Sequence, residues 1–306
     1  MLRYLTPYLL RFILILLGVT VLVFLILHLT PGDPARLMLP DGASDEAVAE
    51  MRRTLGLDRP LPQQYATYLG GLLAGDLGTS LRHRVPNAEI IGSYLPNTLR
   101  LAFAAIAMAT LVGVPLGVLA ALTRNSVWDI GSLIVALLGQ SLSPVVLGPL
   151  LIFAFAVRLK WLPAFGADSA ASIVLPAITL GAPLVALLTR LTRASVLEVL
   201  NEDYVRTARA KGLRRRDVVV RHVMRNAMAT VVTVLGLQLG TVLGGAVVTE
   251  TIFAYPGVGR LAIDSILARD FPLVQSITLI VSFLFVLVNL LVDLSYYWFD
   301  PQLRYR

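Results

Sequence analysis

The chain has 306 residues, of which 57% are hydrophobic and 15% are charged, and its mean hydropathy is +0.76. This composition is too apolar for an ordinary soluble domain and predicts a protein that uses lipid as its solvent. The absence of cysteine excludes disulfides and thiolate metal sites, and the net charge of +7 gathers beside apolar spans, so it does not indicate nucleic-acid binding.

Six apolar stretches divide the chain, and each is long enough to cross a bilayer as a helix. No small-residue cleavage site stands near Leu29, which predicts a retained first span rather than a signal peptide. We therefore predict an all-α membrane protein that forms a single transmembrane domain over residues 1–306. The predicted spans cover residues 9–29, 99–122, 130–157, 173–190, 231–250 and 273–299.

Residues 30–97, between the first two spans, form a long soluble excursion. Its first residues, Thr30-Pro-Gly-Asp-Pro34, are turn chemistry that ends the first span. Ser44 to Leu55 predicts a short helix, with Ser44 as its N-cap and acidic residues in its first turn. The residues alone leave open whether this excursion is more than a spacer.

Glycine, proline and small polar residues interrupt several spans. Gly113, Pro115 and Gly117 lie inside the second, where neighbouring helices can satisfy the backbone groups that such breakers free. Ser141 and Ser143 lie near the middle of the third, and helix packing is a commoner use of such residues than lining a passage.

A basic, polar segment separates the fourth and fifth spans. Residues 190–230 hold ten Lys and Arg against four Asp and Glu. Two short helices are predicted here, broken at Gly212, because apolar residues recur at helical spacing on both sides of it. Before the glycine these are Leu197, Leu200, Tyr204 and Ala208. Gly212 stands where a left-handed residue would end the first helix.

Positive charge predicts the orientation of the spans. With the N-terminus in the cytoplasm, the inner segments hold fifteen Lys and Arg, and the C-terminus is also cytoplasmic. The two short outer segments hold only Arg158, Lys160, Arg260 and Arg269. Because orientation already demands such a cluster, topology and partner binding both stay open as the reason for any single arginine.

Three further segments join the basic one in resembling a known family. DYVRTARAKGL (203–213), followed by RHVMRNA (221–227), resembles the cytoplasmic loop of permease subunits of ATP-driven importers, in the dipeptide, oligopeptide and nickel branch. Three other segments resemble the extracytoplasmic segments of that branch. They are LGLDRPLPQQY (55–65), YLGGLLAGDLGTSL (68–81) and ETIFAYPGVGRLAIDSILARDFP (250–272). The long excursion after the first span resembles the B-type subunit of the branch.

The resemblance implies a type I ABC importer permease fold with six transmembrane helices and cytoplasmic termini. It implies that residues 191–230 form a loop whose short helices contact a separate ATPase subunit. The contact residues that it implies are Asp203, Tyr204, Thr207, Ala208, Arg209, Ala210, Lys211, Gly212, Leu213 and Arg214. The resemblance also implies that the fifth span borders the translocation path, with Gln238 and Thr241 as candidates for lining it.

The partners implied by the resemblance are a paralogous C-type permease, two ATPase subunits that bind ATP and Mg, and an extracytoplasmic substrate-binding protein. This heterodimer would lie in the plasma membrane of a bacterium or archaeon, in contact with the lipid bilayer and with no nucleic acid. The chain itself is expected to be a transport subunit for dipeptides or oligopeptides, although glutathione and nickel systems share these loops. It is not expected to be an enzyme or to hold a cofactor or a metal.

The sequence contains no motif for binding ATP and no catalytic set, which agrees with a transport subunit whose ATP is bound by separate subunits. Neither Lys160 nor Lys211 stands in a phosphate-binding P-loop, and the histidines His28, His83 and His222 are far apart. The alternative function is a self-sufficient secondary transporter or a channel, which would call for inverted repeats or paired ionisable groups at mid-membrane. A membrane-embedded hydrolase is a third reading, and it lacks a catalytic set.

The basic segment departs from the wider importer class at two places. Residues 206–208 are Arg-Thr-Ala where the wider class has Glu-Ala-Ala, and the peptide branch commonly has Arg-Thr-Ala. Thr230 stands where members of the family often have proline, which predicts a helix that runs more continuously into the fifth span.

Overall fold

A computed structural model describes residues 2–29, 34–37, 39, 42–54 and 56–299, and nearly all of these are helical. The helices of the described residues are α1 Leu2–Leu29, α2 Pro34–Leu37, α3 Asp45–Thr54, α4 Leu61–Leu73, α5 Asn87–Leu122, α6 Val127–Ser141, α7 Pro144–Leu151, the π-helix η1 Ile152–Arg158, the 3-10 helix η2 Ala170–Ile173, α8 Val174–Leu200, α9 Asp203–Ala210, α10 Arg215–Asp217, the π-helix η3 Val218–Val223, α11 Met224–Ile252, α12 Val258–Leu267 and α13 Phe271–Phe299.

Four of the described helices are long and apolar enough to cross a membrane. They cover residues 87–122, 170–200, 215–252 and 271–292, and a bent pair over 127–158 makes a fifth if it counts as one span. The prediction of an all-helical chain with several apolar spans is confirmed. Helix 215–252 also runs through Thr230 without a break, which confirms the continuous entry into the fifth span.

The third predicted span, 130–157, is broken rather than continuous. Two helices bent by 105° replace it, and the bend lies between Ser141 and Pro144. The Ser143 hydroxyl accepts from the Val145 amide at 3.4 Å and so begins α7 as an N-cap. Pro144 carries no N–H and disfavours a helical residue before it, so α6 ends there.

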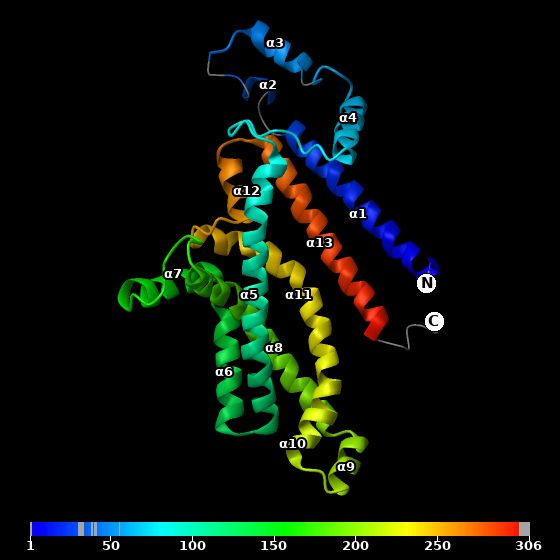
Figure 1. Ribbon diagram of the computed structural model, residues 1–306, viewed down its shortest axis with the longest axis vertical. Coiled ribbons are helices and arrows are strands. Elements are labelled where there is room, and N and C mark those ends of the chain that lie inside the picture. Colours follow the sequence, from blue (N-terminus) through cyan, green and yellow to red (C-terminus); the bar gives the residue numbers. More distant parts are fainter. Residues whose placement is uncertain (1, 30–33, 38, 40–41, 55, 300–306) are drawn as a thin grey trace. The chain divides into compact units, whose positions relative to one another are not determined.

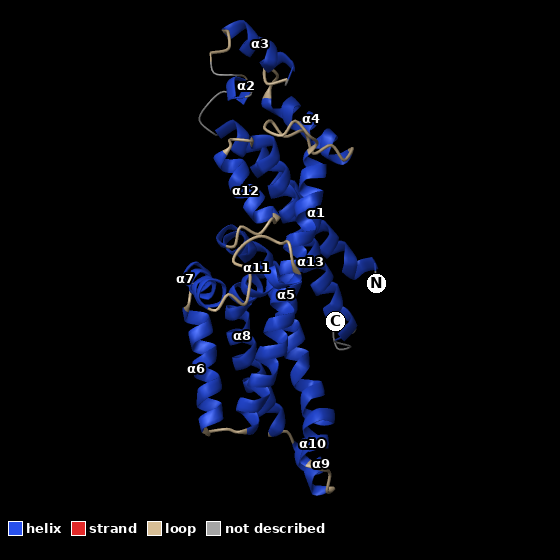
Figure 2. Cartoon of the chain, turned by 60° about the vertical axis from the view of Figure 1, so that its left-hand side comes forward, coloured by secondary structure: helices blue, strands red, loops and turns tan. Residues whose placement is uncertain are grey.

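The chain divides into two compact units, one of residues 1–95 with 261–290 and one of residues 96–260 with 291–306. The second unit holds a core formed by α5, α8 and α11, which lie alongside one another (Figures 1 and 2). Small residues let these helices approach closely. A Cβ at Gly117 would lie 2.6 Å from the Thr189 carbonyl oxygen, and one at Gly181 would lie 2.7 Å from Met108.

The first unit contains the excursion and the start of α13. Ser44 caps α3 as predicted, because its hydroxyl accepts from the Ala47 amide at 3.3 Å. Buried Asp270 accepts from the Ser80 hydroxyl and from the Leu81 amide at 3.2 Å. Buried Asn87 donates to the Leu77 carbonyl at 2.9 Å and to the Pro272 carbonyl at 3.1 Å, so the loop before α5 is fixed to the beginning of α13.

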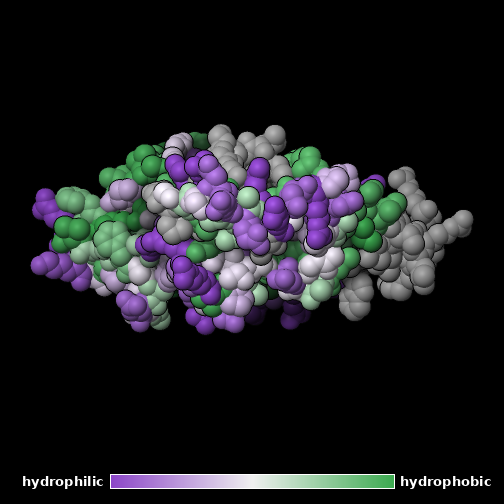
Figure 3. Space-filling model, turned by 90° about the horizontal axis from the view of Figure 1, so that it is seen from above, coloured by the Kyte–Doolittle hydropathy of each residue, from purple (hydrophilic) through white to green (hydrophobic). Residues whose placement is uncertain are grey.

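The outer surface of the excursion is hydrophilic. The charged side chains of α3, including Asp45, Glu46, Arg52 and Arg53, are exposed. Figure 3, which looks down on the end at which Figure 1 labels α3, shows hydrophilic side chains gathered over this face. The excursion therefore presents a water-compatible surface in a chain that is otherwise strongly apolar.

Replacing Gly117 by alanine should destabilise the protein although alanine is the better helix former. Alanine gains about 0.5–1 kcal/mol in a helix, whereas overpacking a close contact costs about 1–3 kcal/mol. Gly131→Ala in α6 is the matched control, because no atom lies within 4 Å of its added Cβ. Denaturant unfolding in detergent should show a loss for Gly117→Ala and no loss for Gly131→Ala. Equal stability of the two variants would contradict the close approach.

Candidate functional site

Before Gly212 the basic segment forms α9, a separate helix of eight residues, as predicted. After Gly212 it begins the long helix 215–252 and not a second short helix. The chain leaves α8 at Asn201, and Glu202 takes an extended conformation before α9 begins at Asp203. The phase of the helical face is therefore reset between Leu200 and Tyr204. For this reason Tyr204 does not share the predicted face with Leu197, Leu200 and Ala208. Tyr204 is exposed, whereas Val205 and Ala208 are buried and pack with Leu197 and Leu200.

The C-terminal end of α9 is closed by a Schellman motif. The Gly212 amide donates to the Arg209 carbonyl at 3.0 Å, and the Leu213 amide donates to the Ala208 carbonyl at 3.4 Å. Gly212 has a φ of +77°, in the left-handed region, and no atom lies within 4 Å of an added Cβ. The prediction that Gly212 ends the helix in a left-handed conformation is confirmed.

A small apolar cluster fixes α9 to the ends of longer helices. Val205 and Ala208 pack with side chains from α5, α8, η3 and α11, namely Ala121, Val196, Val218, Val223 and Ala227. The Asn226 side-chain amide also donates to the Tyr204 hydroxyl at 2.6 Å. Figure 1 shows α9 and α10 beside the ends of α8 and α11. These contacts anchor α9 to the ends of the longer helices.

Nine of the ten residues predicted to contact an ATPase subunit lie on the exposed surface of this segment. They are Asp203, Tyr204, Thr207, Arg209, Ala210, Lys211, Gly212, Leu213 and Arg214. Ala208 is the exception, because it is only 6% exposed and packs against the apolar cluster. Ala208 lies on the buried side of α9, where it packs the helix against the cluster and is not accessible to a partner.

The exposed surface of this segment is strongly basic. Arg206 lies 3.7 Å from Asp203, but both side chains are exposed, so this pair adds little stability. Arg215 donates to the Leu122 carbonyl at 3.1 Å and so satisfies a C-terminal carbonyl of α5. The remaining exposed cations of the segment are Arg209, Lys211, Arg214, Arg216, Arg221 and Arg225.

A bidentate ion pair involves Arg193, which lies on α8 at the beginning of the basic segment. Arg193 contacts both carboxylate oxygens of Asp129, Nε to Oδ1 at 2.7 Å and Nη2 to Oδ2 at 2.8 Å. The Asn125 amide donates to the same carboxylate at 3.0 Å. The pair joins α6 to α8. Sequence reasoning missed it, since the two residues are 64 positions apart and nothing local links them.

Gln238 and Thr241 lie one helical turn apart on α11, outside the basic segment. The Thr241 hydroxyl donates to the Gln238 carbonyl at 2.8 Å and lies 2.6 Å from Gln238 Oε1. Thr241 is exposed, as is Gly244 on the same side of the helix. Exposed Thr241 and half-buried Gln238 therefore form a hydrogen-bonded polar pair on one face of α11.

A second feature that sequence reasoning missed is the buried carboxylate of Glu250 near the end of α11. It accepts from the Thr98 hydroxyl at 2.6 Å and from the Arg260 amide at 3.0 Å. The Thr98 hydroxyl in turn accepts from the Val258 amide at 2.8 Å, and Gly257 packs so closely on Glu250 that a Cβ there would clash. The signal in the sequence was a lone acid between an apolar span and the Tyr255-Pro-Gly turn.

The described residues contain no group of three or more His, Asp or Glu side chains that could hold a metal ion.

Comparison with known proteins identifies relatives of the whole chain. Residues 113–305 match the family described as the binding-protein-dependent transport system inner membrane component, and residues 1–102 match the N-terminal family of the same systems. The glutathione transport system permease protein GsiC of Escherichia coli O6:H1 is 45% identical over 306 residues, and that of Pectobacterium atrosepticum is 46% identical over 307. Each alignment covers 100% of both chains.

Solved structures of low sequence identity share the fold. A chain of the inward-facing MetNI methionine ABC transporter is similar with a TM-score of 0.58 at 18% identity, covering 67% of this chain and 93% of that chain. A chain of an amino acid ABC transporter gives a TM-score of 0.55 at 17% identity, covering 68% and 92%. The fold is therefore that of ABC transporter permeases.

Removing the Arg193 side chain should strongly destabilise the protein, because it would leave the Asp129 carboxylate, whose side chain is 4% exposed, without its counter-charge. Breaking one partner of a buried pair costs about 3–5 kcal/mol. Arg193→Leu should therefore unfold at markedly lower denaturant concentration in detergent. Arg206→Leu, which breaks only an exposed pair, is the matched control and should change little. A loss of the same size in both variants would argue against the bidentate pair.

Replacing Glu250 by glutamine should also destabilise the protein, although the two side chains have nearly the same shape. Thr98 and Arg260 each donate to one oxygen of Glu250, so glutamine would replace one of these acceptors by NH2 and leave one donor without its hydrogen bond, at a cost of about 1–3 kcal/mol. Glu198→Gln, at an exposed position of α8, is the control and should be neutral. Unchanged thermal stability of Glu250→Gln would show that Glu250 does not act as a carboxylate acceptor.

Proposed function

The chain belongs to the family of binding-protein-dependent transport system inner membrane components, and on this premise we propose how its structure serves import. It is a permease subunit of an ABC importer in the peptide and glutathione branch. Segment 203–214 is the docking site for a separate ATPase subunit, which binds ATP and Mg and supplies the energy. The exposure of nine of the ten predicted contact residues on one short, well-fixed segment carries this proposal.

The proposed topology has six spans with both termini in the cytoplasm. The four long apolar helices and the bent pair supply five, and α1, whose residues Leu10–Leu25 are apolar, supplies the first. The fifteen inner Lys and Arg support this orientation. The domain is a single permease domain over residues 1–306, with an extracytoplasmic loop at 30–97 and a coupling loop at 191–230, in the plasma membrane of a bacterium.

The proposed mechanism is transmission by rigid bodies. ATP closes two ATPase subunits, one of which holds α9 and the other the equivalent segment of a paralogous permease. Because α9 is fixed to the ends of α5, α8 and α11 by the cluster around Val205, its displacement moves those helices. A central path, with Gln238 and Thr241 on its wall, would then open alternately to the two sides.

The proposed substrates are short peptides delivered by an extracytoplasmic binding protein. The relatives that are 45–46% identical over the whole chain carry the name of glutathione transport systems, and glutathione is itself a tripeptide.

The exposed apolar surface of α6 supports contact with lipid or with the second permease. Its most exposed large side chains are Val127, Trp128, Ile130 and Leu138.

Replacing Gly212 by valine should weaken coupling between ATP hydrolysis and uptake. A β-branched residue at a φ of +77° costs about 1–2 kcal/mol, which corresponds to docking that is about fivefold to thirtyfold weaker. Gly212→Asn is the matched control, because asparagine adopts the left-handed conformation at low cost. Uptake of a labelled peptide and ATPase activity should be measured on the same assembled complex.

We expect uptake to fall in Gly212→Val while the Asn variant stays close to the original protein. Normal assembly and normal uptake in the valine variant would overturn the docking role of this turn. Uptake by the chain without any ATPase would overturn the importer function itself.

A further inference from the structure

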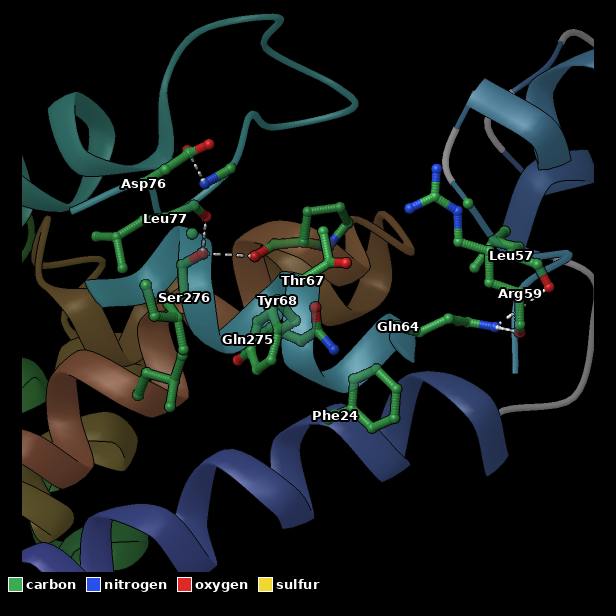
Figure 4. Close-up of a pocket in the computed structure, with 16 residues that line it drawn as sticks. Phe24, Leu57, Arg59, Gln64, Thr67, Tyr68, Asp76, Leu77, Gln275 and Ser276 are labelled. Carbon is green, nitrogen blue, oxygen red and sulfur yellow. Dashed lines mark hydrogen bonds between the residues drawn. The ribbon is translucent and has the colours of Figure 1, made fainter. Parts of the chain in front are cut away.

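The first unit holds a cavity of about 460 Å³ that the proposed function does not use. Its wall comes from α1, from the turn before α4, from α4 itself, from the loop after it and from the start of α13 (Figure 4). The contacts of Asp270 and Asn87 described above fix the last two of these segments to each other. The volume lies within the range of about 300–1,000 Å³ that is usual for small-molecule sites.

The middle of the cavity offers hydrogen-bonding groups beside aromatic surface. The Tyr68 hydroxyl is buried and finds no hydrogen-bond partner among the described residues. Burial and the neighbouring Tyr65 raise the pKa of Tyr68 to about 12, so the hydroxyl keeps its proton and can donate. The Gln275 side-chain nitrogen donates to the Val23 carbonyl at 3.0 Å, and the side-chain oxygen stays available as an acceptor.

The two ends of the cavity carry opposite charges. Figure 4 shows Arg59 at one end and Asp76 at the other, with Tyr68 and Gln275 between them. The Asp76 carboxylate accepts from the Gly78 amide at 2.8 Å, which holds it at the rim. Within the described part of the chain neither Arg59 nor Asp76 forms an ion pair, and both side chains are exposed.

We propose that this cavity binds a short peptide with free termini, whose carboxylate lies against Arg59 and whose ammonium group lies against Asp76. Tyr68 and Gln275 then bond the peptide groups between the two termini. An extended peptide of three residues spans about 10 Å, a length suited to a cavity of this size. The site is separate from α9 and from the path on α11, and it shares with the proposed function only the class of solute.

Other occupants would lack one part of this match. A loop of a partner protein has no free termini, so it would use neither charge in this way. An anionic lipid headgroup would be attracted by Arg59 but repelled by Asp76. Blocking each terminus of a peptide separately therefore distinguishes the proposed ligand from both.

The experiment measures binding of trialanine, N-acetyl-trialanine and trialanine amide. The protein is the full chain in lipid nanodiscs, with the subunits that co-purify and without any soluble binding protein. Each cap should weaken binding about threefold to fivefold, the size expected for one partly exposed ion pair. Asp76→Asn should abolish only the effect of the N-acetyl cap, and Arg59→Gln should abolish only the effect of the amide cap.

Matched controls separate the charges at the rim from general surface charge. Asp58→Asn and Arg53→Gln change exposed charges of the same excursion that do not line the cavity, and both should keep the two cap effects. Tyr68→Phe should weaken all three peptides alike, because it removes a donor to the peptide groups.

Three results would overturn the inference: no binding of trialanine, equal binding of capped and uncapped peptides, or cap effects that persist in Asp76→Asn and Arg59→Gln. None of these outcomes bears on uptake driven by ATP. Conversely, a failure of the Gly212 experiment would leave this binding measurement intact, so the two proposals are tested apart.

Discussion

A buried charged or polar group in an apolar chain has to find its partners inside the protein, because hydrocarbon offers none. Three acids are buried in the described part of the chain, Asp129, Glu250 and Asp270. Each accepts hydrogen bonds from backbone amides at a loop or a helix end, and Asp129 also pairs with an arginine. The acids therefore act as joints between segments that are distant in sequence.

The three buried acids lie near helix ends, and contacts of a different kind join the helix interiors. Asp129, Glu250 and Asp270 all act near the ends of helices, where unsatisfied amides are available. Between those ends, the helices of the second unit meet at glycines such as Gly117 and Gly181, where an added Cβ would lie 2.6 Å and 2.7 Å from an atom of the neighbouring helix. The helix interiors are therefore held together by close packing, and the helix ends by hydrogen bonds to buried acids.

Local chemistry was sufficient to predict the helical character of the chain, the cap at Ser44 and the turn at Gly212. Each depends on residues within one or two turns of each other. The break before Pro144 was missed because a long apolar run outweighed one proline in the reading of the third span. Tyr204 was assigned wrongly to the apolar face because the extended residue at Glu202 resets the phase of α9. No sequence periodicity indicates the ion pair of Asp129 with Arg193 or the hydrogen bond of Thr98 with Glu250, because both depend on tertiary structure.

The basic segment has two possible explanations, orientation in the membrane and docking of a partner, and the structure helps to weigh them. Orientation requires only positive charge near the ends of spans. It does not require the exposure of Tyr204 at 42% and Leu213 at 44%, which flank the cations of α9 at either end. Aromatic and apolar side chains surrounded by arginine are typical of protein interfaces, where they provide most of the affinity. The combination of exposed apolar side chains, a rigid turn and a buried apolar seat therefore favours a docking surface over a signal for topology alone.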